Sequence, residues 1–173
     1  MENYDFLEFF NKIYNECKNI GFKKHILWAL SNLVAGDDYH VLNFLRSEFY
    51  LKTRYILEKE NNPDLLEIAL RIFYLIIIEE RPEISMKILD KDFLEFLINI
   101  LSQISHNNTN INCYILEIIN QGLIIEKTEK AIELKFEVFN VIEKIGAIDI
   151  FENLLNNQNE QINEYVDKLI RNI

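Results

Sequence analysis

The sequence of 173 residues predicts an all-α fold built from repeated helical units. Three observations lead to this prediction. A pentapeptide, DFLEF, occurs at residues 5–9 and again at residues 92–96. Turn-forming residues are scarce, since 4 Gly and 2 Pro are too few for the many turns of a β-sandwich or barrel. Polar breaks rich in Asn alternate with long apolar stretches of helical length.

The copies of the pentapeptide set the length of the repeat. A weaker copy begins at Glu48, 43 residues after Asp5 and 44 residues before Asp92. A period near 43 lies in the range of armadillo and HEAT repeats, which contain two or three helices per unit. A fourth copy begins at Asp149, 57 residues after Asp92, which predicts an insertion in the third unit. We therefore expect an armadillo/HEAT-like right-handed superhelical solenoid of about three to four repeats.

The individual helices follow from the polar breaks. Each break should start a long helix, because Asn, Asp and Thr favour the N-cap and Pro63 suits a first turn. Gly36 and Gly122 are expected to end or interrupt helices. We expect long helices at residues 21–35, 63–80, 111–125 and 159–172, and short linking helices at 37–45, 83–89 and 127–144. One armadillo-repeat domain, 1–173, should comprise a partial repeat (1–36), two repeats (37–80 and 81–125), and an insertion with a C-terminal cap (126–173).

Charge and hydropathy restrict the class of partner. The net charge is −10, so nucleic acid and anionic membranes are not expected, whereas a basic peptide or protein is the electrostatic complement. The first ten residues have no basic region of a signal peptide. The run IALRIFYLIII is interrupted by Arg71 and is too short to span a bilayer. We therefore expect a soluble intracellular protein.

One helix carries an aromatic side chain on the side that should face away from the core. Within KHILWALSNLVA (24–35), Ile26, Leu30 and Val34 form an apolar stripe. Trp28 and Asn32 fall on the opposite side, one turn apart. An indole can hold the stem of a Lys or Arg, and a carboxamide can bond the backbone of an extended peptide. The alternative interpretation is that Trp28 packs against the neighbouring repeat and Asn32 bonds a loop carbonyl.

The stretch LWALSNLVAG (27–36) resembles the W-x-x-x-N-x-x-x-G pattern in the armadillo repeats of the importin-alpha family of nuclear-import adaptors. ILEIINQG (115–122) resembles a later repeat that keeps Asn, and residues 141–170 are similar to the closing segment of that family. The resemblance covers the C-terminal third of the family. It implies a groove for Lys/Arg-rich localisation signals, contact with a nuclear transport receptor, and residence in cytoplasm and nucleus. Trp28, Asn32 and Asn120 would be the peptide-binding residues.

Several residues depart from the pattern of that family. Arg71 stands where the second repeat would have Trp, and it would repel a cationic ligand. Leu75 stands at the corresponding Asn position, and Leu116 at the Trp position of the third repeat. His25 replaces a common Glu three residues before Trp28. These departures favour a second hypothesis, in which the chain is a degenerate armadillo scaffold within a larger assembly and its groove no longer binds peptides.

The first helix is amphipathic, and its apolar side has no earlier repeat to cover it in this sequence. Repeat arrays need polar caps at both ends. We therefore expect Phe6, Phe9 and Phe10 to form a protein-docking face that is covered by another chain or by self-association.

Nothing in the sequence indicates catalysis, a metal site or a cofactor. His25, His40 and His106 lie in different units without the spacing of metal ligands. A Gly-rich phosphate loop and a G-x-S-x-G motif are both absent. Cys17 and Cys113 form no C-x-x-C pair, and we interpret them as reduced thiols, with a single disulfide as the alternative.

Overall fold

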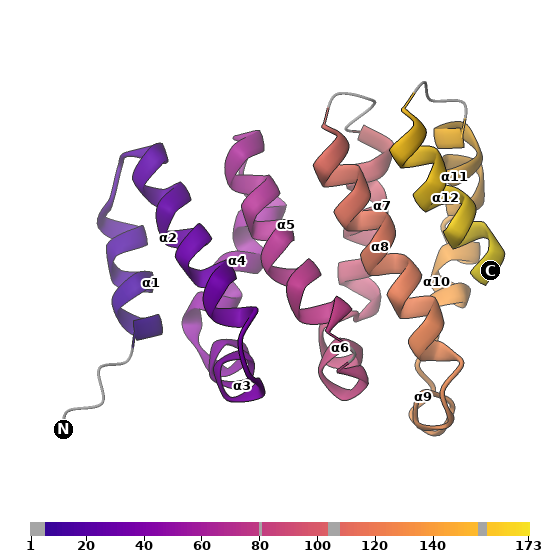
Figure 1. Cartoon of the computed structure of the whole chain (residues 1–173), viewed down its shortest axis with the longest axis horizontal. Coiled ribbons are helices and arrows are strands. Elements are labelled where there is room, and N and C mark those ends of the chain that lie inside the picture. Colours follow the sequence, from indigo (N-terminus) through magenta and orange to yellow (C-terminus); the bar gives the residue numbers. More distant parts are fainter. Residues whose placement is uncertain (1–5, 80, 104–107, 156–158) are drawn as a thin grey trace. The chain divides into compact units, whose positions relative to one another are not determined.

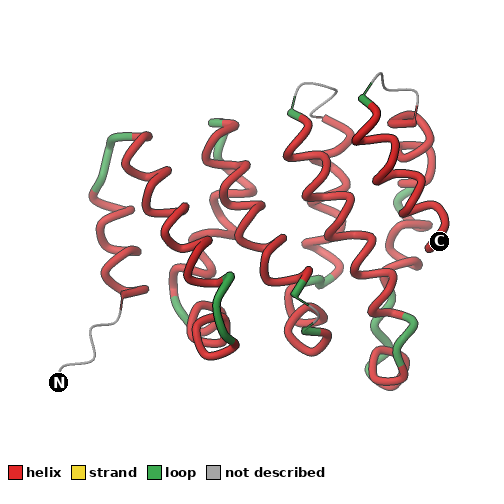
Figure 2. Tube along the Cα trace, viewed as in Figure 1, coloured by secondary structure: helices red, strands yellow, loops and turns green. Residues whose placement is uncertain are grey.

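The structure is a computed structural model that describes residues 6–79, 81–103, 108–155 and 159–173. Within these ranges all regular secondary structure is helical, so the predicted all-α class is confirmed (Figure 2). The chain divides into two compact units, Met1–Ile76 and Ile77–Ile173.

The core of the first unit is rich in aromatic rings. Phe44, Phe49 and Phe73 are fully buried, and the ring of Tyr14 lies 5.9 Å from that of Phe49. Tyr50 joins two of them, since its ring lies 5.7 Å from Phe44 and 6.0 Å from Phe73. The helices of this unit are α1 (Phe6–Glu16), α2 (Ile20–Val34), α3 (Asp38–Arg46), α4 (Glu48–Lys59) and α5 (Pro63–Ile78), the last of which extends beyond the border.

The second unit is dominated by two long helices that run side by side, α8 (Thr109–Glu126) and α12 (Glu160–Asn172) (Figure 1). Asn159 Nδ2 donates to Thr109 Oγ1 at 2.8 Å where both helices begin, and Lys127 Nζ donates to the Asn172 carbonyl at 2.7 Å where both end. The helices of this unit are α6 (Pro82–Ile88), α7 (Lys91–Gln103), α8 (Thr109–Glu126), α9 (Glu129–Glu133), α10 (Val138–Lys144), α11 (Ala147–Leu155) and α12 (Glu160–Asn172).

The four long helices α2, α5, α8 and α12 all start at an asparagine cap. In each case the side-chain oxygen accepts a bond from a backbone N–H of the first turn, which would otherwise lack a partner. The polar breaks predicted from the sequence therefore act as helix starts. The caps are Asn19 to Phe22 N (2.9 Å), Asn62 to Asp64 N (3.1 Å) and Leu65 N (3.2 Å), Asn108 to Ile111 N (3.2 Å), and Asn159 to Gln161 N (3.0 Å) and Ile162 N (3.3 Å).

Two expectations about the helices differ from the structure. Gly122 neither ends nor interrupts α8, which continues to Glu126. A Cβ there would lie 3.2 Å from Val138 Cγ2 and 3.3 Å from Leu89 Cδ1, so glycine lets α8 approach α10 and the end of α6 closely. The segment 127–144 forms two short helices, α9 and α10, rather than one continuous linking helix.

Candidate functional site

The exposed side of α2 presents the two residues that the periodicity singled out. Trp28 is 54% exposed, and Asn32, one turn further along the helix, is also exposed. Ile26, Leu30 and Val34 are buried on the opposite side. The indole and the carboxamide are therefore both available to solvent on one face of a helix whose other face is fixed in the core.

The backbone beneath Trp28 is held at both ends of α2. The Asn19 cap fixes the first turn, and Gly36 N donates to the Leu33 carbonyl at 3.2 Å just beyond the last turn. Ser31 is completely buried, and its hydroxyl donates to the Trp28 carbonyl at 2.7 Å. These hydrogen bonds fix the backbone that carries the indole, and none of them involves the side chain of Trp28.

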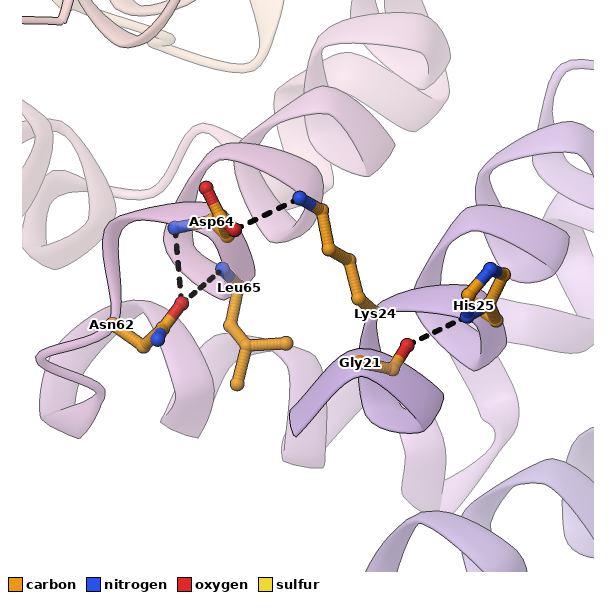
Figure 3. A network of polar contacts seen from close by, with 6 residues as sticks. All are labelled: Gly21, Lys24, His25, Asn62, Asp64 and Leu65. Carbon is orange, nitrogen blue, oxygen red and sulfur yellow. Dashed lines mark hydrogen bonds and ion pairs between the residues drawn. The ribbon is translucent and has the colours of Figure 1, made fainter. Parts of the chain in front are cut away.

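Two polar contacts join α2 to α5 within the first unit. Lys24 Nζ pairs with Asp64 Oδ2 at 2.9 Å (Figure 3), and Arg71 Nη1 donates to Ser31 Oγ at 2.7 Å. In each helix the two contacting residues are seven positions apart, about two turns, so the helices run alongside each other between the contacts. Ser31 thus links Arg71 directly to the carbonyl of Trp28. The guanidinium of Arg71 is therefore held against α2, the helix that carries Trp28.

The face of α5 that carries Arg71 also carries two carboxylates, Asp64 and Glu67, seven and four positions before it. His25 is exposed, and its Nδ1 donates to the Gly21 carbonyl at 2.7 Å (Figure 3), so the ring adds no carboxylate. Asp64 is already paired with Lys24. Leu75 is half-buried. Because Lys24 and Asp64 form a neutral pair, the cation that a basic ligand on Trp28 would meet from these contacts is Arg71.

The two residues that were expected to line the groove in the third repeat, Leu116 and Asn120, lie in the interior. Leu116 is fully buried and Asn120 is only 2% exposed, because α12 packs along α8. Asn172 Nδ2 donates to Asn120 Oδ1 at 2.6 Å, and Lys168 Nζ bonds Glu117 Oε1 at 3.0 Å. The expectation that Asn120 offers its carboxamide to a peptide is corrected, since α12 occupies that side of α8. Leu116 is likewise enclosed in the core.

The residues of the expected docking face on α1 are largely solvent-exposed. Phe6 is 64% exposed, Phe9 is 57% exposed, and Phe10 is half-buried with its ring 6.3 Å from that of Phe9. Leu7 and Tyr14 of the same helix are buried. Part of the apolar surface of α1 therefore packs in the core, and Phe6 and Phe9 remain exposed to solvent.

Both cysteines carry free thiols in this structure. Burial, followed by the charge of Glu117, raises the pKa of the Cys113 thiol to about 11, which leaves it protonated at neutral pH. The Cys17 thiol donates to the Asn19 carbonyl at 3.6 Å. His106 lies outside the described residues. In the described part of the chain, no three His, Cys, Asp or Glu side chains gather in a way that could hold a metal ion. None of the helices there is both long and apolar enough to cross a membrane.

The hydrogen bonds of Ser31 to Arg71 and to the Trp28 carbonyl were not predicted from the sequence. A signal was available, because the pairs Lys24–Asp64 and Ser31–Arg71 are both separated by 40 residues, close to the repeat length.

Comparison with solved structures identifies the fold. One computationally designed armadillo repeat protein, made for modular peptide recognition, matches with a TM-score of 0.74 and 13% sequence identity, over 95% of this chain and 63% of its own. The fold is that of armadillo-repeat proteins. A second engineered protein matches with the same TM-score and 12% identity, over 97% of this chain and 62% of its own. This chain thus spans slightly less than two thirds of the length of either armadillo-like structure. No protein-family model matches the sequence, and neither does any curated protein sequence.

Proposed function

We propose that this chain is a peptide- or protein-binding armadillo module that uses the exposed face of α2. The observation that carries the proposal is the placement of Trp28, a large apolar side chain that is 54% exposed on a helix anchored at both ends. Trp is enriched among the residues that contribute most to binding at protein interfaces. Asn32, one turn away, supplies a donor and an acceptor for the backbone of an extended peptide.

The armadillo fold itself agrees with a binding role rather than an enzymatic one. A structure of the same fold was designed for modular peptide recognition. Following the resemblance of residues 27–36 to importin-alpha, we propose a Lys/Arg-rich segment as the ligand, held by its aliphatic stems on Trp28. The same resemblance leads us to propose a nuclear transport receptor as a further partner, and the cytoplasm and nucleus as the location.

The test is calorimetric titration of a short Lys/Arg-rich peptide into the full chain at low and at physiological salt. Trp28→Ala should weaken binding by about 1–3 kcal/mol, the range of an aromatic residue at the centre of an interface. Tyr39→Ala is the matched control, because Tyr39 is also exposed (68%) but lies on α3. The proposal fails if the peptide does not bind the unmodified chain. It also fails if Trp28→Ala and Tyr39→Ala both bind the peptide as tightly as the unmodified chain.

A second function, that of a scaffold subunit whose groove is no longer used, is favoured by the burial of Leu116 and Asn120 beneath α12. In this case the exposed side of α1, with Phe6 and Phe9, would contact another chain or a second copy. Light scattering on dilute protein distinguishes the cases: association that is lost in Phe6→Ser/Phe9→Ser, together with no peptide binding, would favour the scaffold. A monodisperse monomer without binding of an apolar dye would exclude this docking face.

A further inference from the structure

The second unit contains an open cavity of about 660 Å³ that the sequence analysis did not anticipate. It lies among α6, α7 and the segment that forms α9 and α10, which is the segment where the repeat spacing predicted extra residues. Leu89 and Leu94 are buried in its lining, and Leu134, 62% exposed, adds further apolar surface. The volume is within the range of pockets that bind ligands, roughly 300–1,000 Å³.

Lysines are concentrated around this cavity although the chain as a whole is acidic. Five of the 18 Lys and Arg residues line it. Two are already paired, Lys130 with Glu83 and Lys91 with Glu95. The other three have no ion pair to a carboxylate in the part of the chain that the structure describes: Lys87, Lys135 and Lys144.

The acidic groups in the lining are engaged within the protein. Glu83 accepts a hydrogen bond from Lys130, which is the main cause of a lowered pKa, and the charge of Lys87 acts in the same direction. Asp90 Oδ1 accepts from Phe93 N at 2.8 Å as the cap of α7. Glu137 Oε2 accepts from Asn140 Nδ2 at 2.6 Å. Five lysines against three carboxylates leave the lining with a net positive charge, which favours an anionic ligand.

The backbone places one of these lysines in an unfavourable conformation. Lys135 has a φ of 54°, in the left-handed region that favours glycine. Its N–H donates to the Ile132 carbonyl at 3.2 Å, and Phe136 N donates to the Ala131 carbonyl at 2.9 Å, the bonding pattern of a Schellman motif at the end of α9. Backbone strain of this kind clusters at ligand-binding sites. The turn keeps a cation at the cavity where a glycine would be the easier choice.

We propose that this cavity binds an acidic peptide segment of a partner protein. One large apolar side chain of the peptide enters between Leu89, Leu94 and Leu134, and its flanking carboxylates pair with Lys87, Lys135 and Lys144. A peptide fits better than nucleic acid or an anionic membrane, because Leu89, Leu94 and Leu134 offer an apolar contact and the net charge of −10 opposes a dense array of phosphates more than a few carboxylates. This ligand has the opposite charge to the one proposed for α2, so the two proposals stand or fall separately.

The probe is a fluorescein-labelled peptide of Asp and Glu residues around a single central Phe, titrated with the full chain and followed by fluorescence anisotropy. We expect saturable binding at low salt that weakens as salt is raised. Lys87→Glu/Lys135→Glu/Lys144→Glu should weaken it by at least about tenfold. The matched control, which reverses three exposed lysines of the first unit, should stay within about twofold of the unmodified chain: Lys12→Glu/Lys18→Glu/Lys59→Glu.

Two further measurements test the apolar part of the proposal and the choice of ligand. Leu134→Ser, at an exposed position where folding should not suffer, and a probe with Ser in place of Phe should each weaken binding several-fold. The proposal is overturned if the probe shows no saturable binding, or if the control variant loses as much affinity as the cavity variant. It is also overturned if single-stranded RNA or anionic lipid vesicles bind more tightly than the peptide through the same three lysines.

Discussion

Replacing Lys135 by glycine should stabilise the protein. The residue has a φ of 54°, and the two backbone hydrogen bonds around it, Lys135 N to the Ile132 carbonyl and Phe136 N to the Ala131 carbonyl, hold the turn in this conformation. A residue with a Cβ pays roughly 1–2 kcal/mol to adopt left-handed dihedral angles. Glycine adopts them without that cost and keeps both hydrogen bonds.

The expected gain is smaller than the strain alone. Glycine gives the unfolded chain more freedom, which costs about 0.4–1 kcal/mol. The difference leaves a net stabilisation of up to about 1.6 kcal/mol, centred at about 0.8 kcal/mol, which corresponds to a rise in Tm of about 2–3 °C for a chain of this length. Lys135 is exposed and makes no ion pair in the described structure, so no side-chain interaction has to be subtracted.

The assay is urea unfolding followed by far-UV circular dichroism. The control is Glu133→Gly, two positions earlier and in the last turn of α9, where the backbone is helical and glycine should cost about 0.5–1 kcal/mol. The reasoning is refuted if Lys135→Gly lowers the free energy of unfolding while the control behaves as expected. If the acidic peptide binds in the cavity, the stabilised variant should also bind it more weakly, because a lysine has been removed.

Three other predictions follow from the contacts described. Gly122→Val should lower the free energy of unfolding by about 1–3 kcal/mol, because its Cβ would crowd Val138 and Leu89; unchanged thermal unfolding would contradict this close packing. Arg71→Gln should raise the affinity of a Lys/Arg-rich peptide several-fold in calorimetry by removing a cation beside Trp28; unchanged affinity would place Arg71 away from the ligand. Burial raises the pKa of Cys113 from 9.0 to about 11, so its contribution to stability is fully present below pH 9 and is lost as the pH rises through 11. Unfolding measured on both sides of this range should show a smaller alkaline loss for Cys113→Ala.

The features that could be predicted from the sequence depend on local chemistry. A helix start needs an N-cap and a first turn, and both are contiguous in the chain, so caps such as Asn19 and Asn62 can be recognised from the residues alone. The exposure of Trp28 follows from the 100° step of a helix once Ile26 and Leu30 are assigned to the core. The matches with designed armadillo proteins confirm the fold that the repeat length indicated.

The features that could not be predicted depend on what packs across from a residue. Asn120 and Leu116 follow the same pattern as groove residues, and their burial is decided by α12, which begins some 40 residues later. Glycine often marks the end of a helix, yet Gly122 lies inside α8. There it allows close packing against Val138 of α10 and Leu89 at the end of α6. The cavity likewise depends on how the segment of α9 and α10 folds back toward α6 and α7.

The helix starts of this protein use two kinds of cap. The asparagine caps of the four long helices are neutral at any pH, whereas α3 and α7 are capped by Asp37 and Asp90, which accept from His40 N at 3.1 Å and Phe93 N at 2.8 Å. The cap at the start of α2 therefore keeps the same charge and the same hydrogen bond in acid and in base, so the first turn of the helix that carries Trp28 does not depend on pH through its cap.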